Sequence, residues 1–332
     1  MADFYNVFLN TENAQQVFSK LDHCRKMVKR GSEPRCLLVT GPSGVGKSFI
    51  FKEYVKQNPK TKKVGGYDIP VLLTRIAEKP TIADTAFKML EDLEQGFIAS
   101  LKDARTLVTM LKGLLVRCNT KIIIIDEFQE LVEFKTIEEI INIANWLKHL
   151  SCDANIPIVL TGTMWSQSIL EEAQWSSRMM YRIELEYFCY EERSMTEFRR
   201  ILIGLARRLP IKTALDFNED KIAIPILLIT EGSFRHLKWF LEDAVEFAED
   251  EDAESLTKYH LISALLNNIK CEPSLIGGGE GNTKTVFDYS ENKLIILANQ
   301  AKVITSNDTS LDSANKFKGK IQYNLINFLR KK

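Results

Sequence analysis

The apolar run Cys36-Leu37-Leu38-Val39-Thr40 leads directly into Gly41-Pro42-Ser43-Gly44-Val45-Gly46-Lys47-Ser48. A short run of this kind, rich in aliphatic residues, predicts a buried strand, and the second run has the spacing G-x-x-x-x-G-K-[ST] of a phosphate-binding loop. A helical pattern follows from Phe49 to Lys56. Strand, loop and helix therefore occur in the order that this motif requires, which predicts an α/β nucleotide-binding fold.

Each part of this loop has an expected role toward ATP and Mg²⁺. Glycines allow backbone N–H groups and the helix N-terminus to point at a phosphate group. We expect Lys47 to reach the β- and γ-phosphates and the Ser48 hydroxyl to ligate Mg²⁺. The other nucleotide-binding candidates are Gly41, Pro42, Ser43, Gly44, Val45, Gly46 and Phe49. The alternative is a glycine-rich turn without a ligand.

A second strand ends in two carboxylates, in the run Ile122-Ile123-Ile124-Ile125-Asp126-Glu127. This is the Walker B pattern, in which the first carboxylate binds the metal ion and the second polarises the attacking water. We therefore expect Asp126 to ligate Mg²⁺ and Glu127 to be catalytic, so that the protein hydrolyses ATP. Two acidic residues in a solvated loop are the alternative.

Apolar runs and helical patterns define three expected domains. A mostly parallel sheet is predicted from five short runs separated by helical stretches: Cys36–Val39, Val71–Leu73, Ile122–Ile125, Ile156–Leu160 and Arg182–Leu185. We expect an α/β domain over residues 1–188 and an all-α domain over 189–272. The glycine cluster at 277–281 predicts a flexible joint within a C-terminal extension, 273–332, that binds a partner.

Composition limits the functional classes. The 332 residues carry 44 basic and 44 acidic side chains, so the whole chain lacks the basic character of a dedicated nucleic-acid module. No apolar stretch approaches the roughly 20 residues of a membrane span, and the N-terminus does not resemble a signal peptide. We expect a cytoplasmic protein without membrane contact. The six cysteines form no CxxC pair, which argues against a zinc site.

Taken in order, these motifs resemble the AAA+ class of P-loop ATPases. The resemblance implies a five-stranded parallel sheet of order 5-1-4-3-2, an all-α lid and a homo-oligomer. It also implies that Thr161, which ends the run from Ile156, acts as sensor 1, and that Arg235 in Gly232-Ser233-Phe234-Arg235 acts as sensor 2. A threonine-rich turn and an exposed surface arginine are the alternatives.

The same resemblance implies a catalytic arginine supplied by a neighbouring subunit. Two residues fit its place just before the fifth strand: Arg178, which we prefer, and Arg182. A surface salt bridge is the alternative for either residue.

Within this class the chain resembles the TnsC/TniB regulators of DNA transposition. The resemblance rests on CLLVTGPSGVGKS, KIIIIDEFQEL, IPIVLTGT and TEGSFRHLKWFLEDA. It implies an ATP-dependent protein that assembles on duplex DNA, as a ring or filament, and links a TniQ-like target-selection protein to the transposase. The compact size is similar to members from CRISPR-associated transposons. The alternatives are a signal-sensing ATPase that does not touch DNA and an initiator-type ATPase.

Contact with duplex DNA is expected between the second and third strands. Two helical stretches there, Thr81–Glu94 and Leu101–Arg117, carry side chains that can contact phosphate groups without reading bases. The candidates are Lys79, Lys88, Ser100, Lys102 and Arg105, with Thr106 and Lys112 nearby. Solvated helix faces are the alternative.

Overall fold

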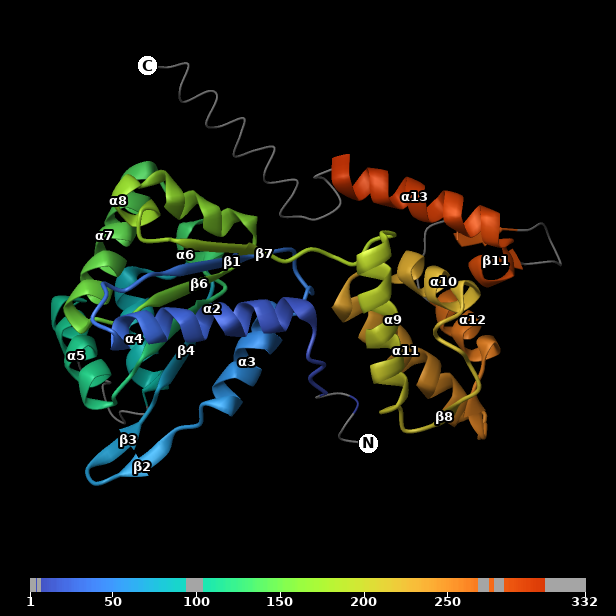
Figure 1. Ribbon diagram of the computed structural model, residues 1–332, viewed down its shortest axis with the longest axis horizontal. Helices are drawn as coiled ribbons and strands as arrows, with labels where there is room; N and C mark the ends of the chain where they lie inside the picture. Colours follow the sequence, from blue (N-terminus) through green and yellow to red (C-terminus); the bar gives the residue numbers. More distant parts are fainter. Residues whose placement is uncertain (1–3, 5–6, 94–103, 268–274, 278–283, 308–332) are drawn as a thin grey trace, which may run out of the picture. The chain divides into compact units, whose positions relative to one another are not determined.

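The computed structural model describes residues 4, 7–93, 104–267, 275–277 and 284–307 (Figure 1). The chain forms two compact units. An α/β unit contains Asn13–Ser43 and Lys47–Leu185, and a helical unit contains the described residues from Glu186 to Asn307, those up to Glu12, and Gly44–Gly46.

A five-stranded parallel sheet forms the centre of the α/β unit. Its strands are β1 (Leu37–Thr40), β4 (Val71–Arg75), β5 (Ile122–Asp126), β6 (Ile158–Gly162) and β7 (Tyr181–Glu184). They lie in the order β4-β5-β6-β1-β7, which is the predicted order 5-1-4-3-2 and is therefore confirmed. Every residue of β1, β5 and β6 is buried, which explains why these strands appear in the sequence as continuous apolar runs.

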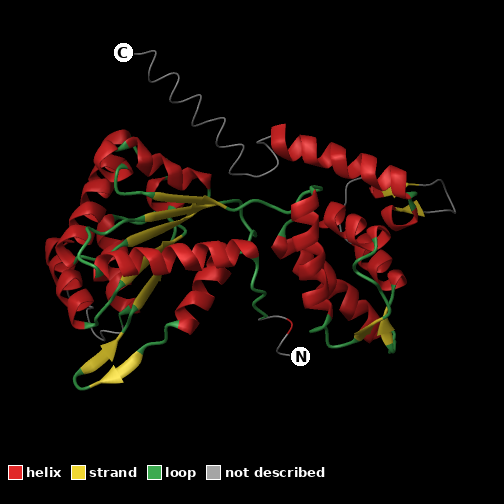
Figure 2. Ribbon diagram, viewed as in Figure 1, coloured by secondary structure: helices red, strands yellow, loops and turns green. Residues whose placement is uncertain are grey.

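Helices surround this sheet (Figure 2). They are α2 (Glu12–Lys29), α3 (Lys47–Gln57), α4 (Ile82–Asp92), α5 (Ala104–Arg117), α6 (Gln129–Val132), α7 (Ile137–Ala154), η1 (Met164–Glu171) and α8 (Ala173–Ser176). Capping boxes begin two of them: Thr81 with Asp84 at α4, and Thr136 with Glu139 at α7. Each box pairs donors that the first helical turn leaves without a partner, so these starting points are specified locally.

The helical unit has a separate hydrophobic core. Its helices are α9 (Glu192–Ala206), α10 (Asp220–Thr230), α11 (Phe234–Asp250), α12 (Lys258–Asn267), η3 (Val286–Asp288) and α13 (Glu291–Asn307). The sequence predicted helices alone for residues 189–272, whereas the structure adds a short parallel pair, β8 (Lys212–Thr213) with β9 (Ser255–Leu256). Two-residue strands carry no detectable period in a sequence, which is why they were not predicted.

The structure corrects the expectation that residues 273–332 form a separate extension. Val286, Phe287 and Leu294 are almost fully buried in the core of the helical unit, and α13 packs against α10. A short antiparallel pair, β10 (Ile276–Gly277) with β11 (Lys284–Thr285), joins the two sides of the glycine cluster. Burial of these apolar residues stabilises the helical unit, so its fold continues beyond the predicted boundary. Residues 308–332 lie outside the described residues.

A helix needs a long apolar stretch to cross a membrane. Among the helices that the structure describes, none has an apolar stretch long enough to cross a membrane.

Gly232 provides a test of the helical unit. Its φ is +67°, and a Cβ atom there would lie 1.8 Å from the carbonyl oxygen of Phe188. We expect Gly232→Ala to lower the free energy of unfolding by about 2–4 kcal/mol, because strain and overlap add. For Gly113, inside α5, no described atom outside its own helix backbone and chain neighbours lies within 4 Å of a Cβ built there. Gly113→Ala is the matched control, and we expect it to stabilise the protein by about 0.5–1 kcal/mol in urea denaturation. Equal effects of both changes would contradict this account.

Candidate functional site

The loop after β1 has the backbone of a phosphate cradle. Gly44 and Gly46 have φ values of +83° and +100°, a region that side-chain-bearing residues rarely adopt. A Cβ atom on Gly41 would lie 2.4 Å from the carbonyl oxygen of Leu185, so glycine is required there for space. Lys47 begins α3, is 7% exposed, and its Nζ donates to the carbonyl oxygens of Gly41 at 2.6 Å and Pro42 at 2.8 Å. An anion in the loop would compete for the same ammonium donors.

Asp126 ends β5 with its carboxyl group buried, since the residue is only 3% exposed. Burial raises the pKa of Asp126, while a hydrogen bond from the Ser48 side chain acts in the opposite direction. The backbone N–H of Glu127 also donates to Asp126 Oδ1, at 3.0 Å. Two residues far apart in the sequence, Ser48 and Asp126, are thus in contact. A hydroxyl beside a poorly solvated carboxylate is a donor set that suits Mg²⁺, which prefers oxygen ligands.

Glu127 is held by both of its carboxylate oxygens. Its φ of +58° is unusual for a residue with a side chain. Oε1 accepts from the guanidinium of Arg75 at 3.3 Å, and Oε2 accepts from Nε2 of Gln129 at 2.8 Å. Oε1 of Gln129 in turn accepts from the backbone N–H of Thr163 at 3.0 Å, so the amide links Glu127 to the end of β6.

Sequence reasoning missed Gln129. The signal available was a polar residue two positions after Glu127, at a place where α6 begins. The side chain is 6% exposed, so a Gln there must find partners within the protein. The partner near β6 lies 34 positions away in the sequence, and no local pattern identifies such a contact.

Thr161 lies on β6 between the two Walker elements. It pairs with Val39 of β1, while the preceding residue, Leu160, pairs with Ile125 of β5. Thr161 is fully buried, and its Oγ1 has no hydrogen-bond partner among the residues that the structure describes. A buried hydroxyl without a partner is uncommon and requires an explanation, and a bound group would supply one.

These residues lie together because the carboxyl ends of β1, β5 and β6 meet at one edge of the sheet. Lys47 and Ser48 follow β1, Asp126 and Glu127 end β5, and Thr161 belongs to the end of β6.

The arginines proposed for the neighbouring site lie away from this edge. The carbonyl oxygen of Arg178 accepts from the N–H of Cys36 at 2.9 Å, which places Arg178 beside the start of β1. Its guanidinium lies 3.7 Å from a carboxylate oxygen of Glu33. Arg182 lies opposite Leu38 in the sheet and donates to Ser176 Oγ at 3.2 Å. The structure does not bring either arginine to the loop of its own chain.

Arg235 belongs to the helical unit. It follows the N-cap residue Ser233 in the first turn of α11, and its guanidinium lies 5.9 Å from the ring centre of Trp239. Its role toward a nucleotide stays a prediction.

The predicted DNA-contacting residues are partly neutralised. Lys88 forms ion pairs with Glu91 at 3.2 Å and Asp92 at 3.0 Å, and Lys112 pairs with Asp153. Lys79 is exposed. Ser100 and Lys102 lie outside the described residues, as does the side chain of Arg105. The described part of this region therefore offers less positive charge to DNA than its composition indicates.

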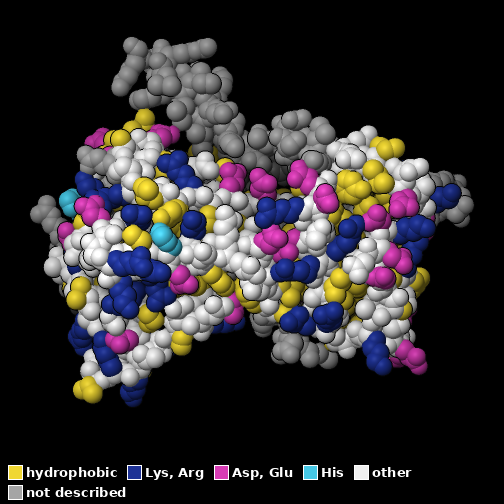
Figure 3. Space-filling view, in the orientation of Figure 1, with side chains coloured by type: hydrophobic (Ala, Val, Ile, Leu, Met, Phe, Trp, Pro, Cys, Tyr) yellow, Lys and Arg dark blue, Asp and Glu magenta, His cyan; other side chains and the backbone are white. Residues whose placement is uncertain are grey.

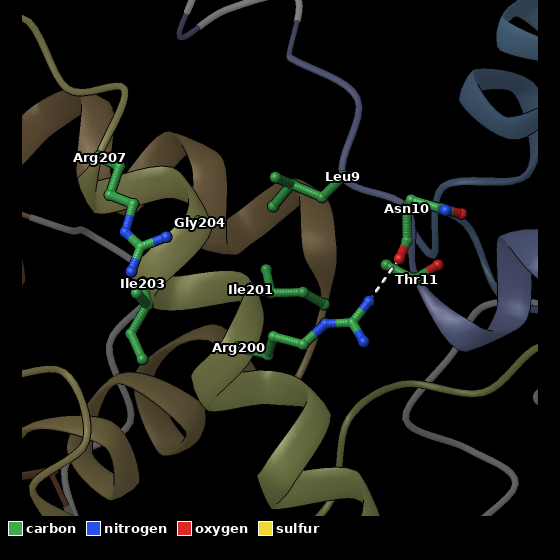
Figure 4. A pocket seen from close by; sticks show the side chains of 8 residues that line it. All are labelled: Leu9, Asn10, Thr11, Arg200, Ile201, Ile203, Gly204 and Arg207. Carbon is green, nitrogen blue, oxygen red and sulfur yellow. Dashed lines mark hydrogen bonds between the residues drawn. The ribbon is translucent and has the colours of Figure 1, made fainter.

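A cavity of about 440 Å³ lies in the helical unit, between the N-terminal segment and α9 (Figure 4). Apolar groups of Leu9 and Ile201 line it, and Gly204 leaves space on the helix. Arg200 donates to the carbonyl oxygen of Asn10 across one side. Its volume lies within the range of small-molecule pockets. No sequence motif predicted this cavity.

Solved structures with a similar fold include ORC and Cdc6 proteins. The ORC2 protein of Aeropyrum pernix, in its ADPNP-ADP complexes, is 16% identical with a TM-score of 0.58, covering 80% of this chain and 69% of that one. Cdc6p of Pyrobaculum aerophilum is 13% identical with a TM-score of 0.59, covering 78% and 68%. The ORC1 protein of Aeropyrum pernix, solved with DNA, is 20% identical with a TM-score of 0.55, covering 78% and 66%. At these identities the likeness shows the fold alone.

No curated protein matches the chain. The sequence profile described as "Bacterial TniB protein" matches residues 5–187, which is more than half of the chain and includes the phosphate loop, the Walker B strand and the strand that ends at Thr161. The chain belongs to the TniB family.

Proposed function

We propose that this TniB-family protein is an ATPase that binds ATP with Mg²⁺ and, when ATP is bound, assembles on duplex DNA to link a TniQ-like target-selection protein to a transposase. The observation that carries the ATP site is that Lys47, Ser48, Asp126 and Glu127 meet at one edge of the sheet, where β1 and β5 end on either side of β6. The family supports the transposition role. An initiator-type ATPase is the second candidate, favoured by the fold shared with ORC and Cdc6 proteins.

Each residue of the site has a separate role in the proposed hydrolysis of ATP. The loop amides and Lys47 bind the phosphates, while Ser48 and Asp126 would hold Mg²⁺, which neutralises charge on the phosphate oxygens when bound. Glu127 orients the attacking water and accepts its proton. The Thr161 hydroxyl, which has no hydrogen-bond partner within the described part of the chain, would donate to the reacting group or its water. Arg235 would contact the phosphates as sensor 2.

Gln129 positions the Glu127 carboxylate in this scheme. The side-chain amide nitrogen of Gln129 donates to Glu127, and its oxygen accepts from the backbone N–H of Thr163, directly after β6. The orientation of the proposed base therefore depends on the strand that carries Thr161. Water activation requires placement of the base to within a fraction of an ångström. Gln129 is therefore a positioning residue, one step removed from the reacting atoms.

Lys47→Ala and Glu127→Gln should have opposite effects on assembly. Loss of the Lys47 cation should weaken ATP binding by about 10- to 100-fold, since a charge-assisted hydrogen bond is lost. Glu127→Gln should preserve binding, lower hydrolysis by about 10²- to 10⁴-fold and trap the ATP-bound state on DNA. Nucleotide titration, phosphate release and electron microscopy with duplex DNA measure the three properties. Equal loss of DNA-bound assembly in both variants would contradict the proposal.

Substitution of Gln129 separates positioning from stability. We expect Gln129→Leu to lower kcat by about 10- to 100-fold with KM nearly unchanged, because Glu127 loses its restraint. Gln129→Glu should also be slow at neutral pH but recover in part at acidic pH, since a protonated carboxyl group can again donate to Glu127. Gln57→Leu, at an exposed amide on α3, is the control. A pH–rate profile of Gln129→Glu parallel to that of the native protein would show that Gln129 is only structural.

A second subunit is proposed to complete the site. Lys47, Ser48 and Asp126 lie at the carboxyl edge of the sheet, whereas Arg178 lies beside the start of β1. Arg178 therefore cannot serve the loop of its own chain without refolding. It is suited to act on the loop of a neighbour in a homo-oligomer, where a cation from outside stabilises charge on the γ-phosphate. Arg182 is the second choice.

Mixed oligomers test this assignment. Arg178→Ala should leave nucleotide affinity nearly intact and lower hydrolysis by about 10³-fold, as expected for loss of an arginine finger. Mixing it with Lys47→Ala should restore part of the activity, because some interfaces then combine an intact loop with an intact arginine. If mixed oligomers form and no ratio restores hydrolysis, Arg178 is not the residue in question and Arg182 is tested in the same way.

A further inference from the structure

The N-terminal segment is held against α9 by polar contacts on both sides of the cavity described above. The N–H of Glu12 donates to a carboxylate oxygen of Glu197 at 3.0 Å, and the Glu12 carboxylate pairs with Arg193 at 2.7 Å. About two turns further along α9, Arg200 donates to the carbonyl oxygen of Asn10. The cavity between the segment and α9 therefore has two walls that the chain itself holds in place.

The inner surface of this cavity is apolar. Leu9 lies on one wall, and Ile201 and Ile203 lie on the other. Ile201 is buried in the core of the helical unit, while Leu9 and Ile203 are half-buried and pack against that core. A Cβ atom on Gly204 would lie 3.0 Å from the side chain of Leu9, so the glycine keeps the space between the walls open. The cavity can therefore take an apolar group out of water.

Arginines surround this apolar surface. Residues 198–208 contain four arginines and no acidic residue. Arg199 pairs with Asp220, and Arg208 donates to a carbonyl oxygen of its own helix at 2.8 Å. Arg207 lines the cavity and is exposed, and its side chain forms no ion pair or hydrogen bond with the residues that the structure describes. Arg207 thus offers a guanidinium group to a ligand in the cavity.

The two ends of the cavity differ in the charge that they offer. Figure 4 shows the guanidinium groups of Arg207 and Arg200 on opposite sides of Ile201. Arg200 already holds the N-terminal segment and lies 3.4 Å from a carboxylate oxygen of Glu197. Figure 3 shows Lys and Arg side chains beside hydrophobic ones on the helical unit. A ligand therefore meets an apolar surface in the middle of the cavity and an available cation at the Arg207 end.

We propose that this cavity binds a segment of a partner protein in which a large apolar side chain stands next to a carboxylate. The apolar side chain lies between Leu9 and Ile203, and the carboxylate pairs with Arg207. The fork of a guanidinium group matches the two oxygens of a carboxylate, and arginine is enriched in protein interfaces.

The rim of the cavity favours a protein segment over a small molecule. Arg207 and Asn10 are exposed, so a polar rim surrounds an apolar centre, as in a protein interface around an anchoring side chain. A small-molecule ligand is usually enclosed over most of its surface. Residues 313–332 of the same chain match poorly, because they carry six basic and no acidic side chains. The cavity shares no residue with the proposed ATP site, so the inference goes beyond the proposed function.

Peptide titration with the full-length protein tests the chemistry of the ligand. The probe is a fluorescein-labelled peptide with one phenylalanine between two glutamates in a glycine and serine background. One control peptide replaces the phenylalanine by serine, and the other replaces both glutamates by glutamine. Fluorescence anisotropy should show binding of the probe and affinities about 10-fold or more weaker for each control, because one loses apolar burial and the other loses the charged hydrogen bonds.

Adjacent arginines provide matched variants of the protein. Arg207→Gln removes the cation that lines the cavity, whereas Arg208→Gln removes an exposed cation that does not line it. We expect Arg207→Gln to weaken binding of the probe about 10-fold and to leave the glutamine peptide unaffected. Arg208→Gln should retain the native affinity for both peptides. Gly204→Met places a side chain in the cavity and should abolish binding of the probe.

Each other outcome overturns the inference. Absence of probe binding up to about 1 mM, or equal loss in the two arginine variants, shows that the cavity does not bind an apolar group beside a carboxylate. If hexanoate displaces the probe at the concentration at which unlabelled peptide does, the cavity takes a small organic anion and not a protein segment. Unaltered thermal unfolding of the arginine variants excludes misfolding as a cause. Nucleotide titration of the native protein is separate, so failure of this site and failure of the proposed ATPase are distinguished.

Discussion

The buried carboxyl group of Asp126 is the constraint on which the site depends. A carboxylate at the end of a fully apolar strand loses solvation, which raises its pKa, and within the chain it is compensated by the Ser48 hydroxyl and the Glu127 N–H. The contact with Ser48 requires the start of α3 to meet the end of β5. Since β6 lies between β1 and β5, the same requirement brings Thr161 to the centre of the site. A stable core and a charged site are thus produced by one strand order.

Local chemistry explains how much could be predicted from the sequence. A phosphate loop needs glycines before a helix, and a metal-binding carboxylate needs a buried strand before it. Both features therefore appear in the sequence as short patterns. The order of the strands was predicted from the class that these patterns resemble. Contacts between distant segments leave no such pattern. Gln129 reaches Thr163 across 34 positions, and the left-handed backbone of Glu127 is not encoded by a glycine. Val286 and Phe287 follow a glycine cluster, which indicated a linker, yet they bury their side chains in the helical core.

The exposure of charged side chains is equally difficult to predict from the sequence. Composition assigned phosphate contacts to the region before β5, but a lysine pattern cannot distinguish a cation beside carboxylates from one that faces solvent. Lys88 meets acidic residues three and four positions along its own helix, and Lys112 meets Asp153 on another helix. In the short antiparallel pair of β2 (Thr61–Lys63) with β3 (Gly66–Asp68), strand alternation places Lys63 beside Asp68 and the carbonyl oxygen of Arg117, whereas Lys62 lies on the opposite face. Zero net charge therefore hides a local excess of cations.

In the proposed function, the geometry also relates hydrolysis to assembly. Glu127, the proposed base, is held by Arg75 at the end of β4 and through Gln129 by Thr163, directly after β6, so its position depends on the strands on both sides of β5. The cation proposed to complete the site lies beside the start of β1, away from the loop of its own chain. A single chain then holds a positioned base without the outside charge that the reaction needs. Under the proposed arrangement a neighbour would be required for turnover, so assembly would precede hydrolysis.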